Sequence, residues 1–180
     1  MKRNLTTRFV LCTIRKQKRC RVEHCGHTES KRGSPVENLK IRGLQREDLE
    51  AIVTIDEKVL GERRKDYWER KLEAVGTKSA QTSFAAEVDG KVVGFILGDI
   101  SGWEFGVPDT IGWIDTIGVD PAYQKRGLAT ALAKELIRGL KEVGVKTIYT
   151  LVSWNDWDLL QFFHAMGFGR GDMINLELKI

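Results

Sequence analysis

Cysteines and long apolar runs are both missing from most of this chain of 180 residues. Its three cysteines, Cys12, Cys20 and Cys25, all lie near the N-terminus, so residues 36–180 contain none. That absence excludes a disulfide framework and favours a reducing, cytoplasmic location. The spacing of Cys20 and Cys25 fits no standard zinc pattern, so we expect no metal. No apolar run approaches the roughly 20 residues that cross a bilayer, so we expect a soluble protein without a membrane partner.

Acidic residues are scarce at the N-terminus, and the charge of the chain is therefore uneven. The first 34 residues carry a net charge of +8, whereas the whole chain carries +4, which leaves −4 on the remainder. The basic character thus belongs to the N-terminal segment, and the rest of the chain is mildly acidic. We therefore do not expect the folded part to bind nucleic acid.

Residues 1–35 show no sustained periodicity and close with a polar stretch that contains Gly33 and Pro35. We expect a basic, disordered tail at 1–35 followed by one folded domain at 36–180. Three interpretations of the tail stay open. It is a basic arm for acidic partners, an organelle transit peptide, because its first 22 residues lack acids, or sequence upstream of the true start codon.

From residue 39 onward the apolar pattern becomes that of a globular domain with both strands and helices. The clearest local signal is Asp89-Gly90 between two strand-like runs, because Asp-Gly favours the tight turn of a hairpin. The order of elements predicts an α/β (α+β) fold. The expected elements are strand 39–42, helices 46–56 and 66–74, strands 83–88, 91–97 and 112–119, helix 127–143, strand 146–153, helix 157–166 and strand 175–180.

The segment between the strand at 112–119 and the helix at 127–143 predicts an anion site. Free N–H groups and the positive end of the helix dipole meet at the N-terminus of a helix. Gly127 has no side chain to keep a phosphate away from those amides. Lys125 and Arg126 add positive charge at the same point.

Residues 124–129, Gln-Lys-Arg-Gly-Leu-Ala, resemble the Gln/Arg-x-x-Gly-x-Gly/Ala motif of the GCN5-related N-acetyltransferase (GNAT) superfamily. The segment 162–168 is similar to the Tyr-x-x-x-Gly-Phe segment of the same family. This resemblance implies the GNAT acyltransferase fold, a mixed central sheet of about six to seven strands flanked by about four helices. It also implies acetyl-CoA as cosubstrate. The residues expected to hold it are Ile117, Gly118, Val119, Gln124, Lys125, Arg126, Gly127, Leu128, Ala129, Thr130 and Asn155.

Acetyl transfer to an amine needs a group that removes a proton from the amine. Asp115 is the first candidate, because it is an acid in an otherwise apolar strand, two residues before the segment expected to bind the acetyl carbonyl. Glu104, in the loop before that strand, is the second.

The leaving thiolate needs a proton, and here the chain departs from the family. Phe163 stands where the family has its tyrosine, and phenylalanine cannot donate a proton. Tyr149 and His164 are candidate substitutes, and solvent is the third option. Counted back from Gly167, Asp156 rather than Asn155 aligns with the family's usual asparagine.

The expected function is N-acetyl transfer from acetyl-CoA to a primary amine by direct attack. The acceptor is a lysine or N-terminus of a protein or peptide, or a small-molecule amine. The alternative is a catalytically impaired module that binds or senses acyl-CoA, and Phe163 is the feature that supports it. The sequence does not name the acceptor or the oligomeric state, and a homodimer is compatible with it.

Overall fold

The computed structural model describes residues 36–75, 82–100, 111–173 and 175–179. The expected tail at 1–35 and the expected loop with Glu104 lie outside these described residues. The elements are β1 (Leu39–Gly43), α1 (Leu49–Leu60), α2 (Lys65–Val75), β2 (Ser83–Val88), β3 (Lys91–Asp99), β4 (Ile111–Val119), α3 (Leu128–Glu142), β5 (Thr147–Thr150) and α4 (Trp157–Ala165).

The strands form one mixed sheet in the order β1-β2-β3-β4-β5. The first four strands pair antiparallel, and β4 pairs parallel with β5. This arrangement confirms the predicted mixed α/β fold with helices on a central sheet. The strand count is lower than expected, because the described residues contain five strands rather than six to seven.

The C-terminal strand expected at 175–180 does not form in the described residues 175–179. Leu176 and Leu178 alternate with polar residues, yet their exposed fractions are 84% and 85%. Alternation is a local property, whereas a strand exists only where a neighbour pairs with its N–H and C=O groups. The strand expected at 146–153 also ends early, at Thr150.

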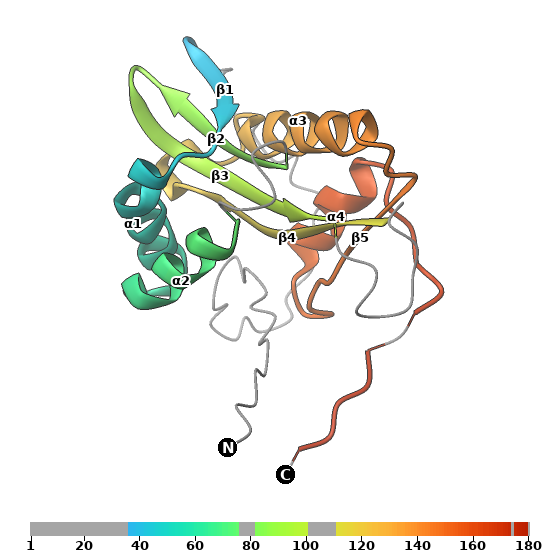
Figure 1. Ribbon diagram of the computed structural model, residues 1–180. Coiled ribbons are helices and arrows are strands. Elements are labelled where there is room, and N and C mark those ends of the chain that lie inside the picture. The colour runs from blue at the N-terminus through green and yellow to red at the C-terminus, as the bar shows by residue number, and fades with distance from the viewer. Residues whose placement is uncertain (1–35, 76–81, 101–110, 174, 180) are drawn as a thin grey trace, which may run out of the picture.

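One face of the sheet carries α3 and α4, and the other carries α1 and α2 (Figure 1). The main core lies under α3, where the helix places one apolar stripe on the sheet. The fully buried residues of the α3 stripe are Leu128, Leu132, Leu136 and Leu140.

Among the described residues, no helix is long and apolar enough to cross a membrane.

A polar network lies within the smaller core under α1 and α2. The indole N–H of Trp68 donates to Asp56 Oδ2 at 2.8 Å. Arg64 donates to both oxygens of the same carboxylate, at 2.7 and 3.0 Å. Because Asp56 is on α1 and its partners precede or lie on α2, this carboxylate fixes α2 against α1.

We expect Asp56→Ala to destabilise the fold by about 3 kcal/mol, because removal of one partner of a buried ion pair leaves the other uncompensated. Urea unfolding measures this loss. Glu50→Ala is the matched control, since Glu50 also lies on α1 and binds two cations, Arg63 and Lys65, but at the exposed surface. It should change the free energy of unfolding little. Equal losses in the two variants would contradict the role of Asp56.

Candidate active site

β4 and β5 separate part of the way along β4. Their pairing runs from Ile111 opposite Thr147 to Ile114 opposite Thr150 and ends there. The Thr150 hydroxyl donates to the carbonyl of Ile114 at 3.0 Å, at the last paired position. β4 continues to Val119, so no described strand pairs with residues 115–119 on this side. We call these residues the fork segment, and its free backbone edge suits an extended ligand.

A β-bulge begins the fork segment. Leu97 of β3 lies opposite Thr116, whereas the next residue, Gly98, lies opposite Ile114, so Asp115 is an extra residue in β4. Bulges redirect side chains and are frequent next to active sites. The bulge brings the Asp115 side chain to α2, where it contacts Lys71.

The predicted carbonyl-binding residues offer only backbone to a ligand. Ile117 and Val119 are buried in the core under α3. Gly118 leaves room for the ring of Phe95, because a Cβ on it would lie 2.7 Å from two ring carbons. The backbone N–H and C=O groups of this segment that do not pair with β3 are therefore the groups that could bind a cosubstrate.

The turn after β4 leads directly from the fork segment to the N-terminus of α3. Asp120 accepts from Ala122 N at 3.0 Å and from Lys58 Nζ at 2.7 Å, which ties the turn to α1. The Gln124 side chain donates to Val119 O at 3.1 Å. Gln124 therefore supports the turn rather than projecting away from it.

The N-terminus of α3 leaves its first amides without side-chain partners, which is the feature from which the sequence predicts an anion site. Gly127 is the N-cap with φ +88°, and no side chain caps the helix. The first intrahelical bond runs from Ala131 N to Gly127 O, so the amides of 128–130 precede it. Lys125 also has a positive φ, of 61°. Leu128 is buried and contributes only its amide, whereas Arg126 is exposed and its guanidinium lies 5.8 Å from the Tyr123 ring centroid.

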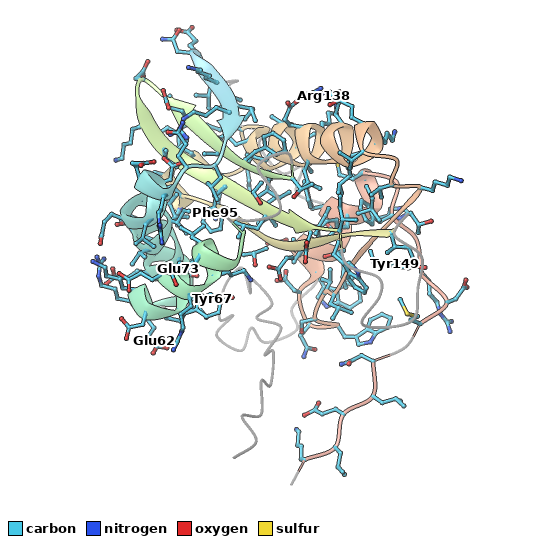
Figure 2. The ribbon with its side chains drawn as sticks, viewed as in Figure 1. Glu62, Tyr67, Glu73, Phe95, Arg138 and Tyr149 are labelled. Carbon is cyan, nitrogen blue, oxygen red and sulfur yellow. The ribbon has the colours of Figure 1, made fainter. Side chains whose placement is uncertain are left out.

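The three catalytic candidates lie in different surroundings. Asp115 and Tyr149 are on the sheet face opposite α3, and Tyr149 packs against Trp113 with ring centroids 5.3 Å apart. Figure 2 shows Tyr149 at the β5 side and Tyr67 on α2. His164 is exposed in the last turn of α4 and has no described contact with the fork segment.

The other C-terminal positions have structural roles. Phe163 is buried, with an exposed fraction of 4%, and packs edge-on against Phe162 and Phe168. Asn155 is exposed, and its backbone N–H donates to Ser153 Oγ at 3.3 Å. Asp156 caps α4 by accepting from Leu159 N at 3.1 Å. The structure therefore does not bring Asn155 to the fork segment through any described contact.

Lys71 is the residue beside Asp115 that the sequence analysis missed. Its Nζ lies 2.6 Å from Asp115 Oδ2 and donates to Tyr67 Oη at 3.0 Å. Burial lowers the pKa of Lys71, but the charge of Asp115 and the two hydrogen bonds outweigh it, so the pKa lies above its usual value. Sequence spacing could have pointed to Lys71, since it follows Tyr67 by four residues and Trp68 by three and so shares their helix face.

The described residues contain no cluster of three or more histidines, cysteines and acids that could hold a metal ion. The candidate site consists of three parts: a backbone edge with which no described strand pairs, a helix N-terminus and an ion pair beside the edge. Such a combination suits a long ligand with an acyl carbonyl at one end and phosphates at the other.

Comparisons with known proteins show which family and which folds this chain is similar to. A sequence model described as the acetyltransferase (GNAT) family matches residues 47–168. The structure is similar to AAC(6')-Iy in complex with a bisubstrate analogue, CoA-S-monomethyl-acetylneamine, with a TM-score of 0.67 and 20% identity over 79% of this chain and 98% of that chain. It is also similar to the ribosomal-protein-S18-alanine N-acetyltransferase from Escherichia coli, with a TM-score of 0.59 and 25% identity over 74% and 79% of the two chains.

We expect Gly127→Val to weaken coenzyme A binding by roughly 10–100-fold, the equivalent of losing one charge-assisted hydrogen bond. Its Cβ would meet no protein atom within 4 Å, so the added side chain would occupy the space expected for a phosphate. Calorimetric titration measures the affinity.

Gly144→Val is the matched control for that experiment. Gly144 has φ +90° and equally open surroundings, but it follows the other end of α3. Both variants carry a backbone strain of about 1–2 kcal/mol, and only Gly127→Val should lose affinity. Equal affinity in the two variants would show that the phosphates bind elsewhere.

Asp120 should make stability depend on pH. Burial raises its pKa, but the hydrogen bonds from Lys58 and Ala122 N outweigh burial and hold the pKa below its usual value. Because its pKa is lower in the folded protein than in the unfolded chain, Asp120 stabilises the fold fully above the unfolded pKa of about 4. This stabilisation is lost as the pH falls through the pKa of Asp120 in the folded state. We expect Asp120→Asn to lose about 1–2 kcal/mol at pH 7 by urea unfolding and less at pH 3. A constant difference between the two pH values would contradict this account.

Proposed function

The chain belongs to the acetyltransferase (GNAT) family, and from this premise we propose that it transfers the acetyl group of acetyl-CoA to a primary amine. The observation that carries the proposal is the continuous run of backbone from the fork segment to the uncapped N-terminus of α3. Acetyl-CoA is the cosubstrate of the family, and a similar structure, AAC(6')-Iy, was solved with CoA bound. The absence of cysteine in residues 36–180 supports a cytoplasmic location.

The proposed cosubstrate site has two ends. The amides of 128–130, with Lys125 and Arg126, hold the pyrophosphate by charge and hydrogen bonds. At the other end, a backbone N–H of 117–119 donates to the acetyl carbonyl and stabilises the oxyanion that develops there. Gln124 keeps the turn between these ends in place through its bond to Val119 O.

The acceptor must reach the carbonyl as a neutral amine. An ordinary lysine has a pKa near 10.4, so its neutralisation at pH 7 costs about 4.6 kcal/mol. Asp115 at the bulge is the proposed base, and it takes the proton as the amine nitrogen bonds to the carbonyl carbon. The C–S bond then breaks, and the thiolate takes a proton from Tyr149 or from solvent.

The acceptor is a primary amine of a protein, a peptide or a small molecule. The similar structures include an aminoglycoside N-acetyltransferase and a ribosomal-protein-S18-alanine N-acetyltransferase, so the fold accepts both small and large acceptors. Thiol release from acetyl-CoA with a panel of peptides, polyamines, aminoglycosides and amino acids tests the proposal. The predicted result is release that depends on one acceptor class.

One observation favours a second candidate, an acyl-CoA-binding module without transfer activity. Phe163 occupies the family's tyrosine position and has no hydroxyl group, so it cannot supply a proton. Its ring packs against those of Phe162 and Phe168. This candidate predicts coenzyme A binding by calorimetry together with no thiol release for any acceptor.

We expect Asp115→Asn to lower turnover by about 10²–10⁴-fold, the usual contribution of a general base. The acid limb of the pH–rate profile should disappear, and coenzyme A affinity should not change. Asp99→Asn is the control, because Asp99 is an exposed acid on β3 opposite Trp113. Wild-type turnover in Asp115→Asn would exclude Asp115 as the base and make Glu104 the first candidate.

A further inference from the structure

Lys71 and Asp115 form an ion pair that differs from most others in the described residues. The exposed fractions of the two side chains are 16% and 27%, whereas pairs such as Arg46–Glu73 lie at the open surface. A pair taken out of water loses solvation, and this loss offsets much of its attraction. Its contribution to stability is therefore a weak explanation for its presence beside the fork segment.

The ammonium of Lys71 is held by more than its ion pair. It donates to Tyr67 Oη, and it lies 5.4 Å from the Tyr67 ring centroid and 6.0 Å from that of Trp68. Trp68 is in turn fixed by its bond to Asp56 of α1. Lys71 thus has a defined position set by both helices of this face.

The carboxylate of Asp115 uses only one oxygen for this pair. Oδ2 contacts Lys71 at 2.6 Å, and Oδ1 accepts no hydrogen bond from a described residue. Other titratable groups on this face are Tyr67 of α2, Tyr149 of β5 and Asp99 at the end of β3. The ion pair therefore sets the orientation of the carboxylate, and among the described residues it leaves Oδ1 without a donor.

We propose that Lys71 is a positioning residue for acetyl transfer: it holds Asp115 at the bulge with Oδ1 directed to the acceptor amine. The role rests on the proposed function. The proton passes from the attacking amine to Oδ1, and Lys71 neither gains nor loses one. Its positive charge also favours the neutral form of a nearby amine, because a second cation there would be repelled. The raised pKa of Lys71 is consistent with a residue that stays charged throughout.

A double-mutant cycle in kcat tests this role. Lys71→Met should lower kcat about 10–100-fold, the cost of a misplaced catalytic group, with an unchanged KM for acetyl-CoA. In the Asp115→Asn background the same substitution should have no further effect, because Lys71 acts through Asp115. Lys71→Arg retains the charge, and its kcat should stay within about tenfold of the wild-type value. This variant keeps the role testable if Lys71→Met folds poorly.

Arg70→Met is the matched control, since Arg70 is the neighbouring exposed cation of α2. It should leave kcat unchanged in both backgrounds. An equal loss from Lys71→Met with and without Asp115 would overturn the positioning role, while an active wild-type chain would leave the proposed function standing. Absence of thiol release by the wild-type chain would count against the proposed function and, with it, against this role.

Discussion

The proposed site depends on the separation of β4 from β5 after Ile114 and Thr150. A parallel pair that continued to Val119 would saturate the backbone of the fork segment and leave nothing for a ligand to bind. The separation occurs beside the bulge at Asp115, and the Thr150 hydroxyl bonds the carbonyl at the point of divergence. The edge of residues 115–119 on the β5 side, with which no described strand pairs, is thus the feature on which the proposed binding relies.

The two helical layers support this edge in different ways. On one face, the buried leucines of α3 pack against the sheet and hold the helix N-terminus at the end of the fork segment. No side chain caps this N-terminus. On the other face, α1 and α2 place charges: Lys58 at Asp120 and Lys71 at Asp115. Apolar packing therefore positions the proposed binding groups, and ion pairs hold the acids next to them.

Sequence reasoning predicted the features that depend on near neighbours in the chain. The hairpin at Asp89-Gly90, the helix after Gly127 and its free amides all follow from residues within one or two turns of each other. It failed for features that depend on contacts with residues far away in the sequence. The bulge at Asp115 is a matter of register against β3, and the Lys71–Asp115 pair joins residues from separate elements. The expected strand at 175–180 failed for the same reason, because pairing requires a neighbour that local alternation does not specify.

The central claim is that the backbone of the fork segment and of the α3 N-terminus forms one binding surface. Amide chemical shifts of ¹⁵N-labelled protein during titration with coenzyme A measure this most directly. The account predicts that the largest changes fall on residues 116–119 and 125–130, and that both groups saturate together with one dissociation constant. Changes confined to other segments, or two groups that saturate independently, would contradict it.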